Sequence, residues 1–314
     1  MLFKIILILA AIVLLISYIV YRIAFYSPNK TQNDDYNIAR GEQMDAQRET
    51  ITAMIDTLNA IPYEPVSIPS DDGLRLRGRY YHQKDGAPVV IGFHGYRGTP
   101  SRDFSGGTEM YLSAGFNLLM VEQRAHCGSE GHTITFGVKE RYDCQAWIDY
   151  VRWRFEPDTP ILLGGISMGA ATVLMASGLD LPENVKGIVA DAPYTSPKAI
   201  IQKVCRDVKI PPKLAYPFLW LGALVFGGFR LGAANAAEAV KHTTVPILLI
   251  HGEDDRFVPC DMGREIAAAN PEMVELHTFP DAGHGLSFLI DRQRYERIAR
   301  AFFARVLATT QEEA

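Results

Sequence analysis

Residues 161–175 read ILLGGISMGAATVLM, and this stretch decides the fold. Residues 161–164 predict a short buried strand and residues 170–175 a helix, so the motif G-x-S-x-G at 165–169 falls on the turn between them. The two glycines of the motif suit such a turn, because a Cβ at either position would crowd neighbouring backbone. A serine on this turn holds its hydroxyl out at the sheet edge, where N–H groups at the helix start favour negative charge. The motif in this context predicts Ser167 as a nucleophile.

The rest of the chain continues the alternation of short apolar runs with longer amphipathic stretches. The runs are continuous, as expected for strands buried on both faces of a parallel sheet, and lie at 89–93, 117–121, 161–164, 187–190, 247–250 and 274–279. We expect helices in the stretches between them, which include 138–155, 170–177 and 266–269. Residues 66–69 and 74–81 predict an opening strand pair with a turn at 71–73. This order predicts a mostly parallel, doubly wound α/β sheet with helices on both faces.

Composition excludes several classes of protein. The chain has 314 residues, 48% hydrophobic and 21% charged, which is a globular balance. Its net charge is -5 and it carries no stripe of lysine and arginine, so we expect no nucleic-acid partner. No CxxC pair occurs, and the spacing of His126, Cys127 and His132 matches no standard zinc site. We therefore expect no metal.

The first segment predicts a membrane anchor. From residue 2 to residue 24 the only strong charges are Lys4 and Arg22. About 20 apolar residues form a helix roughly 30 Å long, which matches the hydrocarbon core of a bilayer. Aromatic residues that favour the membrane interface gather at one end, at Tyr18, Tyr21, Phe25 and Tyr26.

A cleaved signal peptide is the competing interpretation of this segment. The apolar run is long for a signal peptide, and no A-x-A-like site precedes Tyr26 and Pro28. The basic residues that flank the run do not decide its orientation in the membrane, since Lys4 lies at one end and Arg22 and Lys30 at the other. A short basic start before a long apolar run is typical of a signal-anchor, which favours a catalytic domain outside the cytoplasm.

A serine nucleophile needs a base, and the base needs an orienting acid. On a strand–turn–helix site these follow the serine in the order acid, then histidine. The run ending at residue 250 leads into HGEDDRFVP at 251–259, and the last apolar run leads into FPDAGHG at 279–285. These segments supply Asp255 and His284, the latter between small residues in a loop.

These motifs resemble the α/β-hydrolase superfamily, in its serine-aminopeptidase/monoacylglycerol-lipase-like and prolyl-oligopeptidase-like branches, from about residue 65 to 308. The family pattern H-G-x-x-D-x-x-V-P carries the acid at the position of Asp255; Asp254 and Asp191 are weaker alternatives. The resemblance implies an oxyanion hole made of two backbone N–H groups, those of Met168 and Tyr96. Residues 122–132 resemble an R-x-H-G-x-S loop, with Cys127 where glycine is usual, and this departure leaves the geometry of the turn open.

One long interval interrupts the alternation. About 50 residues separate Tyr194 from Val245, and they include an apolar patch at 214–231. We expect a helical lid over the carboxyl edge of the sheet, with Trp220 and Phe226 as substrate contacts. An ordinary helical pair packed on the core is the alternative. The predicted organisation is an anchor at 1–28, a tether and leading helix at 29–60, and an α/β-hydrolase domain at 61–314 with the insertion at about 195–244.

The predicted function is hydrolysis of small carboxylic esters through an acyl-enzyme, by a Ser167–Asp255–His284 triad and without a cofactor. A peptidase or a thioesterase would use the same triad, so these activities remain alternatives. A non-catalytic membrane scaffold on a hydrolase fold is a second alternative, although such proteins have usually lost a member of the triad.

Overall fold

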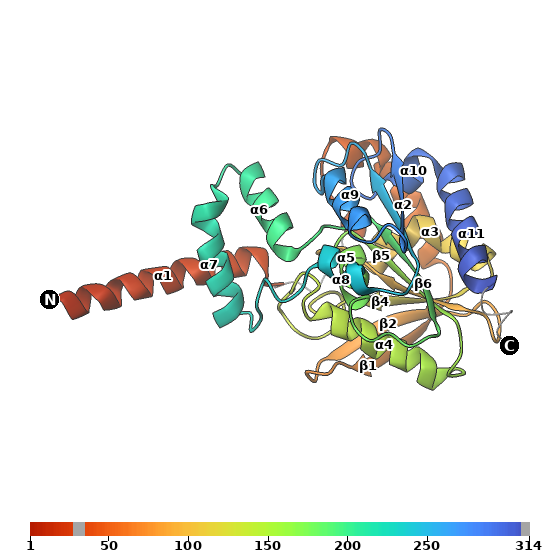
Figure 1. The fold of residues 1–314 in the computed structure, drawn as a ribbon, viewed down its shortest axis with the longest axis horizontal. Coiled ribbons are helices and arrows are strands. Elements are labelled where there is room, and N and C mark those ends of the chain that lie inside the picture. The colour runs from red at the N-terminus through yellow and green to blue at the C-terminus, as the bar shows by residue number, and fades with distance from the viewer. Residues whose placement is uncertain (28–34, 309–314) are drawn as a thin grey trace.

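The computed structural model describes residues 1–27 and 35–308 as one sheet with helices on both faces and a long helix that projects from the body (Figure 1). The tether predicted from residue 29 lies partly outside these ranges. The helices are α1 (Leu2–Ala24), η1 (Asp35–Asn37), α2 (Glu42–Asn59), α3 (Pro100–Ser113), α4 (Glu140–Arg154), α5 (Met168–Ala176), α6 (Pro197–Asp207), α7 (Pro212–Val225), α8 (Ala236–Ala239), η2 (Val240–His242), α9 (Cys260–Ala269), α10 (Ser287–Ile290) and α11 (Arg292–Ala308). The strands are β1 (Glu64–Pro69), β2 (Arg75–Tyr81), β3 (Val89–Phe93), β4 (Asn117–Glu122), β5 (Ile161–Ile166), β6 (Val185–Asp191), β7 (Ile247–Gly252) and β8 (Val274–Phe279).

The eight strands follow the order β1-β2-β4-β3-β5-β6-β7-β8. β2 is antiparallel to both of its neighbours, β1 and β4, and the remaining strands pair in parallel. The doubly wound, mostly parallel sheet predicted from the apolar runs is therefore present. Because the parallel strands share one direction, the loops after β3, β5, β7 and β8 meet at a single edge, which positions the site.

The two faces of the sheet pack against different helices. Alternate side chains of the central strands, such as Ile91 and Leu163, join one core with residues of α4, α5 and α9. The intervening side chains, such as Val90 and Leu162, join a second core with residues of α3 and α11. The central strands are buried on both sides, which is why their sequences are continuously apolar.

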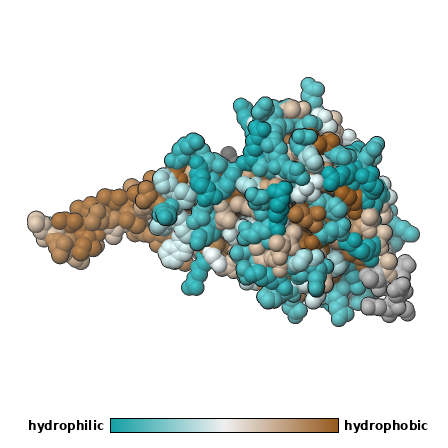
Figure 2. All heavy atoms as spheres, turned by 45° about the horizontal axis from the view of Figure 1, so that its top comes forward, coloured by the Kyte–Doolittle hydropathy of each residue, from teal (hydrophilic) through white to brown (hydrophobic). Residues whose placement is uncertain are grey.

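Helix α1 is apolar and mostly uncovered. Residues 2–16 are all exposed, while Ser17 and Tyr21 are buried. Among the described helices it is the one long and apolar enough to cross a membrane, and in Figure 2 it forms a hydrophobic projection from a largely hydrophilic body. Phe25, the residue that follows α1, is buried, and its ring lies 5.7 Å from Phe136 and 5.4 Å from Phe229 of the insertion.

Within the insertion at 195–244, α6 lies next to the loop after β7, where the Lys203 ammonium donates to the Arg256 carbonyl. Helices α6 and α7 project beside α1, and α7 crosses α1 (Figure 1). The crossing is close because Gly222 lacks a side chain, and a Cβ there would lie 2.5 Å from the Ser17 carbonyl oxygen. Only part of the apolar surface of α7 is covered by α1, since Leu214, Trp220 and Val225 remain exposed. The helix that was predicted to close over the sheet edge instead packs against α1.

Candidate active site

The turn between β5 and α5 holds Ser167 in a strained conformation. Its φ is 57° and its ψ is -114°, outside the regions that non-glycine residues favour. A Cβ at Gly169 would lie 1.8 Å from the Phe93 carbonyl oxygen, and one at Gly165 would lie 2.4 Å from the backbone of Gly169. Glycine is therefore required at both positions, and the close packing that it permits presents the Ser167 hydroxyl at the edge of the sheet.

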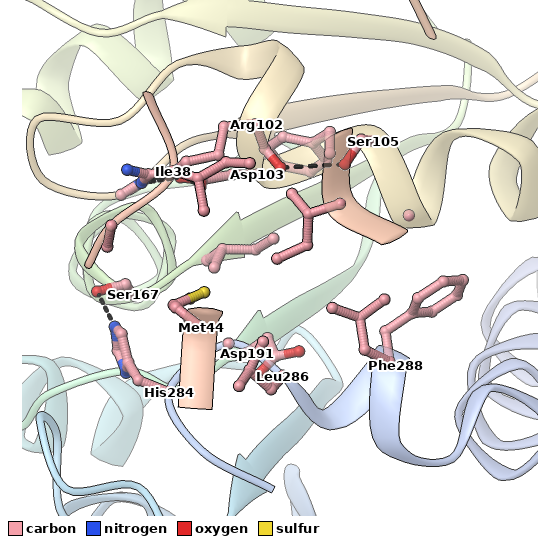
Figure 3. A pocket seen from close by; sticks show the side chains of 18 of the residues that line it. Ile38, Met44, Arg102, Asp103, Ser105, Ser167, Asp191, His284, Leu286 and Phe288 are labelled. Carbon is pink, nitrogen blue, oxygen red and sulfur yellow. Dashed lines mark hydrogen bonds and ion pairs between the residues drawn. The ribbon is translucent and has the colours of Figure 1, made fainter. Parts of the chain in front are cut away.

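Three side chains from separate loops form a continuous hydrogen-bonded chain. His284 Nε2 lies 2.8 Å from Ser167 Oγ, and His284 Nδ1 lies 2.7 Å from Asp255 Oδ2. Figure 3 shows the contact between the imidazole and the serine. With its proton on Nδ1, the imidazole donates to Asp255 and can accept the proton of the Ser167 hydroxyl. The structure thus brings together the three residues predicted from the motifs.

Asp255 is buried and fixed by the backbone that follows it. Its Oδ1 accepts hydrogen bonds from the N–H groups of Phe257 and Val258, at 2.9 and 2.7 Å. Burial acts to raise the pKa of this carboxyl, but the charge of His284 and hydrogen bonds from His251, His284 and Val258 outweigh it. The pKa of Asp255 is held well below its usual range. Asp255 is thus ready to stabilise an imidazolium.

The two alternative acids lie elsewhere. Asp254 is partly exposed, and its carboxylate accepts hydrogen bonds from Gln43 at 2.8 Å and from Arg256 at 3.1 Å. Asp191 is buried at the end of β6, where burial raises its pKa to about 6 and a hydrogen bond from Tyr295 partly offsets this. Within the described residues, neither carboxylate makes a hydrogen bond to the imidazole of His284.

The loop after β3 passes directly behind the serine. A Cβ at Gly95 would lie 3.3 Å from Ser167 Cβ, so the loop contacts the turn closely. Met168 is the first residue of α5, where a backbone N–H has no acceptor within the helix. In the described part of the chain the N–H of Tyr96 also makes no hydrogen bond. Two free N–H groups next to Ser167 can stabilise a negative charge on a carbonyl oxygen.

Two buried histidines hold this loop in place. His94 Nε2 accepts a hydrogen bond from the N–H of Gln123, and His126 Nε2 accepts one from the N–H of Arg97, at 3.1 and 3.0 Å. Burial lowers the pKa of His94 to about 3 and that of His126 to about 4. Both rings are therefore neutral hydrogen-bond acceptors at pH 7.

The turn that carries Cys127 keeps the geometry for which glycine is usual. Cys127 has a φ of 46°, in the left-handed region. The turn is supported by Ser129, whose hydroxyl donates to the Glu122 carbonyl, and by Gly128, whose N–H donates to the Glu122 carboxylate at 2.7 Å. No cluster of metal-ligating side chains occurs among the residues that the structure describes.

A contact that the sequence does not reveal joins α1 to the site. The Tyr96 hydroxyl donates to the Ala24 carbonyl at 2.9 Å, and the Arg97 guanidinium donates to the carbonyls of Ile23 and Tyr26, at 2.8 and 3.2 Å. The loop that carries one of the free N–H groups therefore binds the end of the projecting helix.

A cavity of about 600 Å³ opens beside Ser167 and His284. Apolar residues of α2, α3 and the segment around α10 line it, among them Ile51, Met54, Phe104, Met110, Leu286 and Phe288. Figure 3 shows Leu286 and Phe288 on the side of the pocket formed by the α10 segment. Of the described lining residues, none belongs to the insertion at 195–244, so Trp220 and Phe226 are not cavity residues. The leading helix α2 forms the cavity wall that was predicted to come from the lid. It is held there by Gln43, whose amide donates to the Asp254 carboxylate.

The comparisons with known proteins place this geometry in a family. The family model described as "Alpha/beta hydrolase family" matches residues 89–301, and the chain belongs to that family. The Bacillus subtilis protein YqkD is 22% identical over 236 residues, which are 75% of this chain and 77% of YqkD. Lysophosphatidylserine lipase ABHD12 of Rattus norvegicus is 24% identical over 233 residues, 69% of this chain and 56% of ABHD12.

Solved structures share the fold. The esterase Pf2001 of Pyrococcus furiosus superposes with a TM-score of 0.65 at 22% identity, over 90% of this chain and 98% of the esterase. Est1E of Butyrivibrio proteoclasticus, solved with ferulic acid bound, gives a TM-score of 0.58 at 19% identity, over 77% of this chain and 99% of Est1E. The predicted α/β-hydrolase fold is confirmed.

Proposed function

We propose that this protein is a serine hydrolase that cleaves carboxylic esters through an acyl-enzyme. The observation that carries the proposal is the hydrogen-bonded chain from Ser167 through His284 to Asp255, at 2.8 and 2.7 Å, beside two free N–H groups. A hydroxyl, a base and an oriented acid in this arrangement are the parts that acyl transfer requires.

In the first half-reaction, Ser167 Oγ attacks the ester carbonyl carbon as its proton passes to His284 Nε2. The N–H groups of Tyr96 and Met168 stabilise the oxyanion, each worth about 3 kcal/mol. The ester C–O bond then breaks, and the leaving alkoxide takes the proton from Nε2. Asp255 remains charged beside the imidazolium throughout.

In the second half-reaction, water attacks the acyl-enzyme while His284 accepts its proton. The acid is released as Ser167 regains that proton. Protein side chains supply every proton transfer in this sequence.

The cavity supports an ester with an apolar acyl or alkyl group of modest size. Its walls are mostly aliphatic and aromatic, and its 600 Å³ suits a small ligand. The esterase names of the solved structures and the lipase name of ABHD12 point to the same class of substrate.

A labelling experiment tests the nucleophile. A fluorophosphonate should label the wild type and spare Ser167→Ala. Ser105→Ala is the matched control because Ser105 lines the same cavity without touching His284, and it should be labelled like the wild type. Equal labelling of all three proteins would show that Ser167 is not the nucleophile.

A substrate panel separates the proposed esterase from the alternatives. We expect p-nitrophenyl esters of short and medium acids to be hydrolysed, with turnover falling as the acyl chain outgrows the cavity. Faster cleavage of aminoacyl anilides would favour a peptidase, and faster cleavage of acyl thioesters a thioesterase.

We further propose that α1 is a retained membrane anchor. A signal peptide is cut away, whereas removal of residues 1–25 would expose Phe136 and Phe229 and leave the hydroxyl of Tyr96 without its acceptor. Membrane-bound protein should therefore begin at Met1 when its mass is measured. A mature chain that starts near Tyr26 would refute the anchor.

A further inference from the structure

Helices α6 and α7 form an arm, residues 197–231, that stands beside α1 and carries unusual surface chemistry. Large apolar side chains of α7 and its ends face outward, with Leu214 67% exposed, Val225 52% and Trp220 42%. On the segment before α7, Val208 and Ile210 are also exposed. Exposed apolar residues grouped on one element mark a contact surface.

The length of α1 shows where this surface lies relative to a bilayer. The exposed part of α1 runs from residue 2 to residue 16, and at about 1.5 Å per residue it is roughly 22 Å long. A hydrocarbon core is about 30 Å thick, so a spanning α1 needs roughly five more residues. Those residues are 17–21, and α7 packs on two of them, Ser17 and Tyr21, which are buried.

The contact between the helices fixes the depth of α7. Gly222 packs on the backbone of Ser17, and the Phe226 ring lies 5.1 Å from Tyr18 and 6.0 Å from Tyr21. If residues 17–21 complete the span, then α7 lies at the boundary between hydrocarbon and headgroups. Tryptophan and tyrosine favour that boundary, and Trp220 and Tyr216 lie on this helix.

The arm has a positive net charge, whereas the whole chain has a negative one. The arm has one acidic residue, Asp207, and six basic residues, Lys198, Lys203, Arg206, Lys209, Lys213 and Arg230, whereas the whole chain has a net charge of -5. Apart from Lys203, which pairs with Asp207 at 2.7 Å, these basic side chains belong to exposed residues. Basic residues beside an exposed apolar helix fit a surface of anionic lipid.

We propose that the α6–α7 arm is a second membrane-binding element, which lies in the headgroup region of an anionic bilayer next to α1. The proposal rests on α1 being an anchor and goes beyond the proposed hydrolase function. Two attachments, one spanning and one interfacial, would hold the catalytic domain in a fixed orientation on the membrane.

Fluorescence of Trp220 in the full-length chain tests the proposal. One variant, Trp153→Phe, keeps Trp220; the matched variant, Trp220→Phe, keeps Trp153, which is 81% exposed on α4. Both keep Trp147, which is buried and provides a constant background. Each variant is reconstituted into phosphatidylcholine/phosphatidylglycerol vesicles with and without brominated acyl chains. We expect bromine to reduce the emission of the variant that keeps Trp220 and to leave the other unchanged.

A charge reversal adds an independent readout. Lys209→Glu combined with Lys213→Glu should weaken the quenching of Trp220 in vesicles that contain phosphatidylglycerol and should leave turnover of a soluble ester unchanged. Equal quenching in the wild type and the reversed variant would overturn the role of anionic lipid.

The outcomes separate the inference from the anchor on which it rests. Chain that floats with the vesicles but shows no bromine quenching of Trp220 overturns the inference and leaves the anchor in place. Chain that does not float with the vesicles overturns both. Labelling of Ser167 by the fluorophosphonate reports the hydrolase function separately.

Discussion

Replacing Asp255 with asparagine alters one atom of the carboxyl group, and the surrounding donors determine the consequence. Oδ1 accepts two backbone N–H groups at 2.9 and 2.7 Å, so the asparagine oxygen should occupy that position. Its NH₂ group then replaces Oδ2, which lies 2.7 Å from His284 Nδ1. Since the amide donates, Nδ1 must become the acceptor and the imidazole proton moves to Nε2. The ring can no longer accept the proton of Ser167.

The expected loss of turnover is large. A wrong imidazole tautomer costs roughly ten-thousand-fold in kcat, or about 5 kcal/mol of transition-state stabilisation. If the amide instead turns over, its NH₂ faces the backbone N–H groups of Phe257 and Val258, which costs about 1–3 kcal/mol of stability. Either orientation impairs the site, and the first should dominate because it keeps both main-chain hydrogen bonds.

The assay is the kcat/KM of p-nitrophenyl butyrate hydrolysis by the full-length chain in detergent, with thermal unfolding to show that each variant folds. Asp254→Asn is the matched control, because that carboxylate contacts Gln43 and Arg256 and not His284, and it should keep activity within a few-fold. A folded Asp255→Asn protein that stays within about tenfold of the wild type would refute the assignment. If Asp191→Asn lost turnover and Asp255→Asn did not, the acid of the triad would be Asp191, at the end of β6.

Three further predictions follow from the supports of the site. Tyr96→Phe removes the hydroxyl bound to Ala24 but keeps the backbone N–H, so we expect about 1 kcal/mol less stability and a few-fold lower kcat/KM. Because burial lowers the pKa values of His94 and His126 to about 3 and about 4, the unfolded state binds more protons below pH 6.5. These two groups lower the unfolding free energy by about 4 kcal/mol from pH 7 to pH 5. The buried carboxyls of Asp143 and Asp191, whose pKa values burial raises to about 6, take up protons in the folded state and offset most of this, so the net fall in urea should be about 1 kcal/mol. Gly169→Ala, whose Cβ would lie 1.8 Å from a carbonyl oxygen of β3, should cost at least about 3 kcal/mol in thermal or urea unfolding.

Each of these predictions has an outcome that contradicts it. Unchanged stability and turnover in Tyr96→Phe would mean that the contact with α1 does not hold the loop. An unfolding free energy that rises by about 2–3 kcal/mol from pH 7 to pH 5, as the two carboxyls alone would cause, would show that the histidines titrate normally. Gly164→Ala, whose Cβ has its nearest neighbour at 3.5 Å, should be tolerated, so equal damage from both alanines would exclude a specific clash at the turn.

Local patterns in the sequence identify much of the site. The motif around Ser167 predicts its own strand, turn and helix, because the glycines and the apolar run are consecutive in the chain. Asp255 and His284 are predictable because each follows a recognisable strand, and parallel strands bring the loops at their carboxyl ends to one edge. The long apolar run at the N-terminus likewise predicts α1 from its own composition.

Tertiary structure decides which apolar surfaces meet. The sequence of α7 indicates a helix with an apolar face, but it does not tell whether that face covers a cavity or packs on α1. The contact that decides this, between Gly222 and Ser17, joins residues about 200 positions apart in the sequence. The contribution of α2 to the cavity wall and the hydrogen bond from Tyr96 to Ala24 also join segments that are far apart in the sequence, so no local pattern predicts them. The sequence by itself predicted the strand, turn and helix around Ser167, because that local geometry depends on neighbours in the chain. The surroundings of the site were decided only by packing between distant segments, since burial of apolar area is not directional and many pairings would satisfy it.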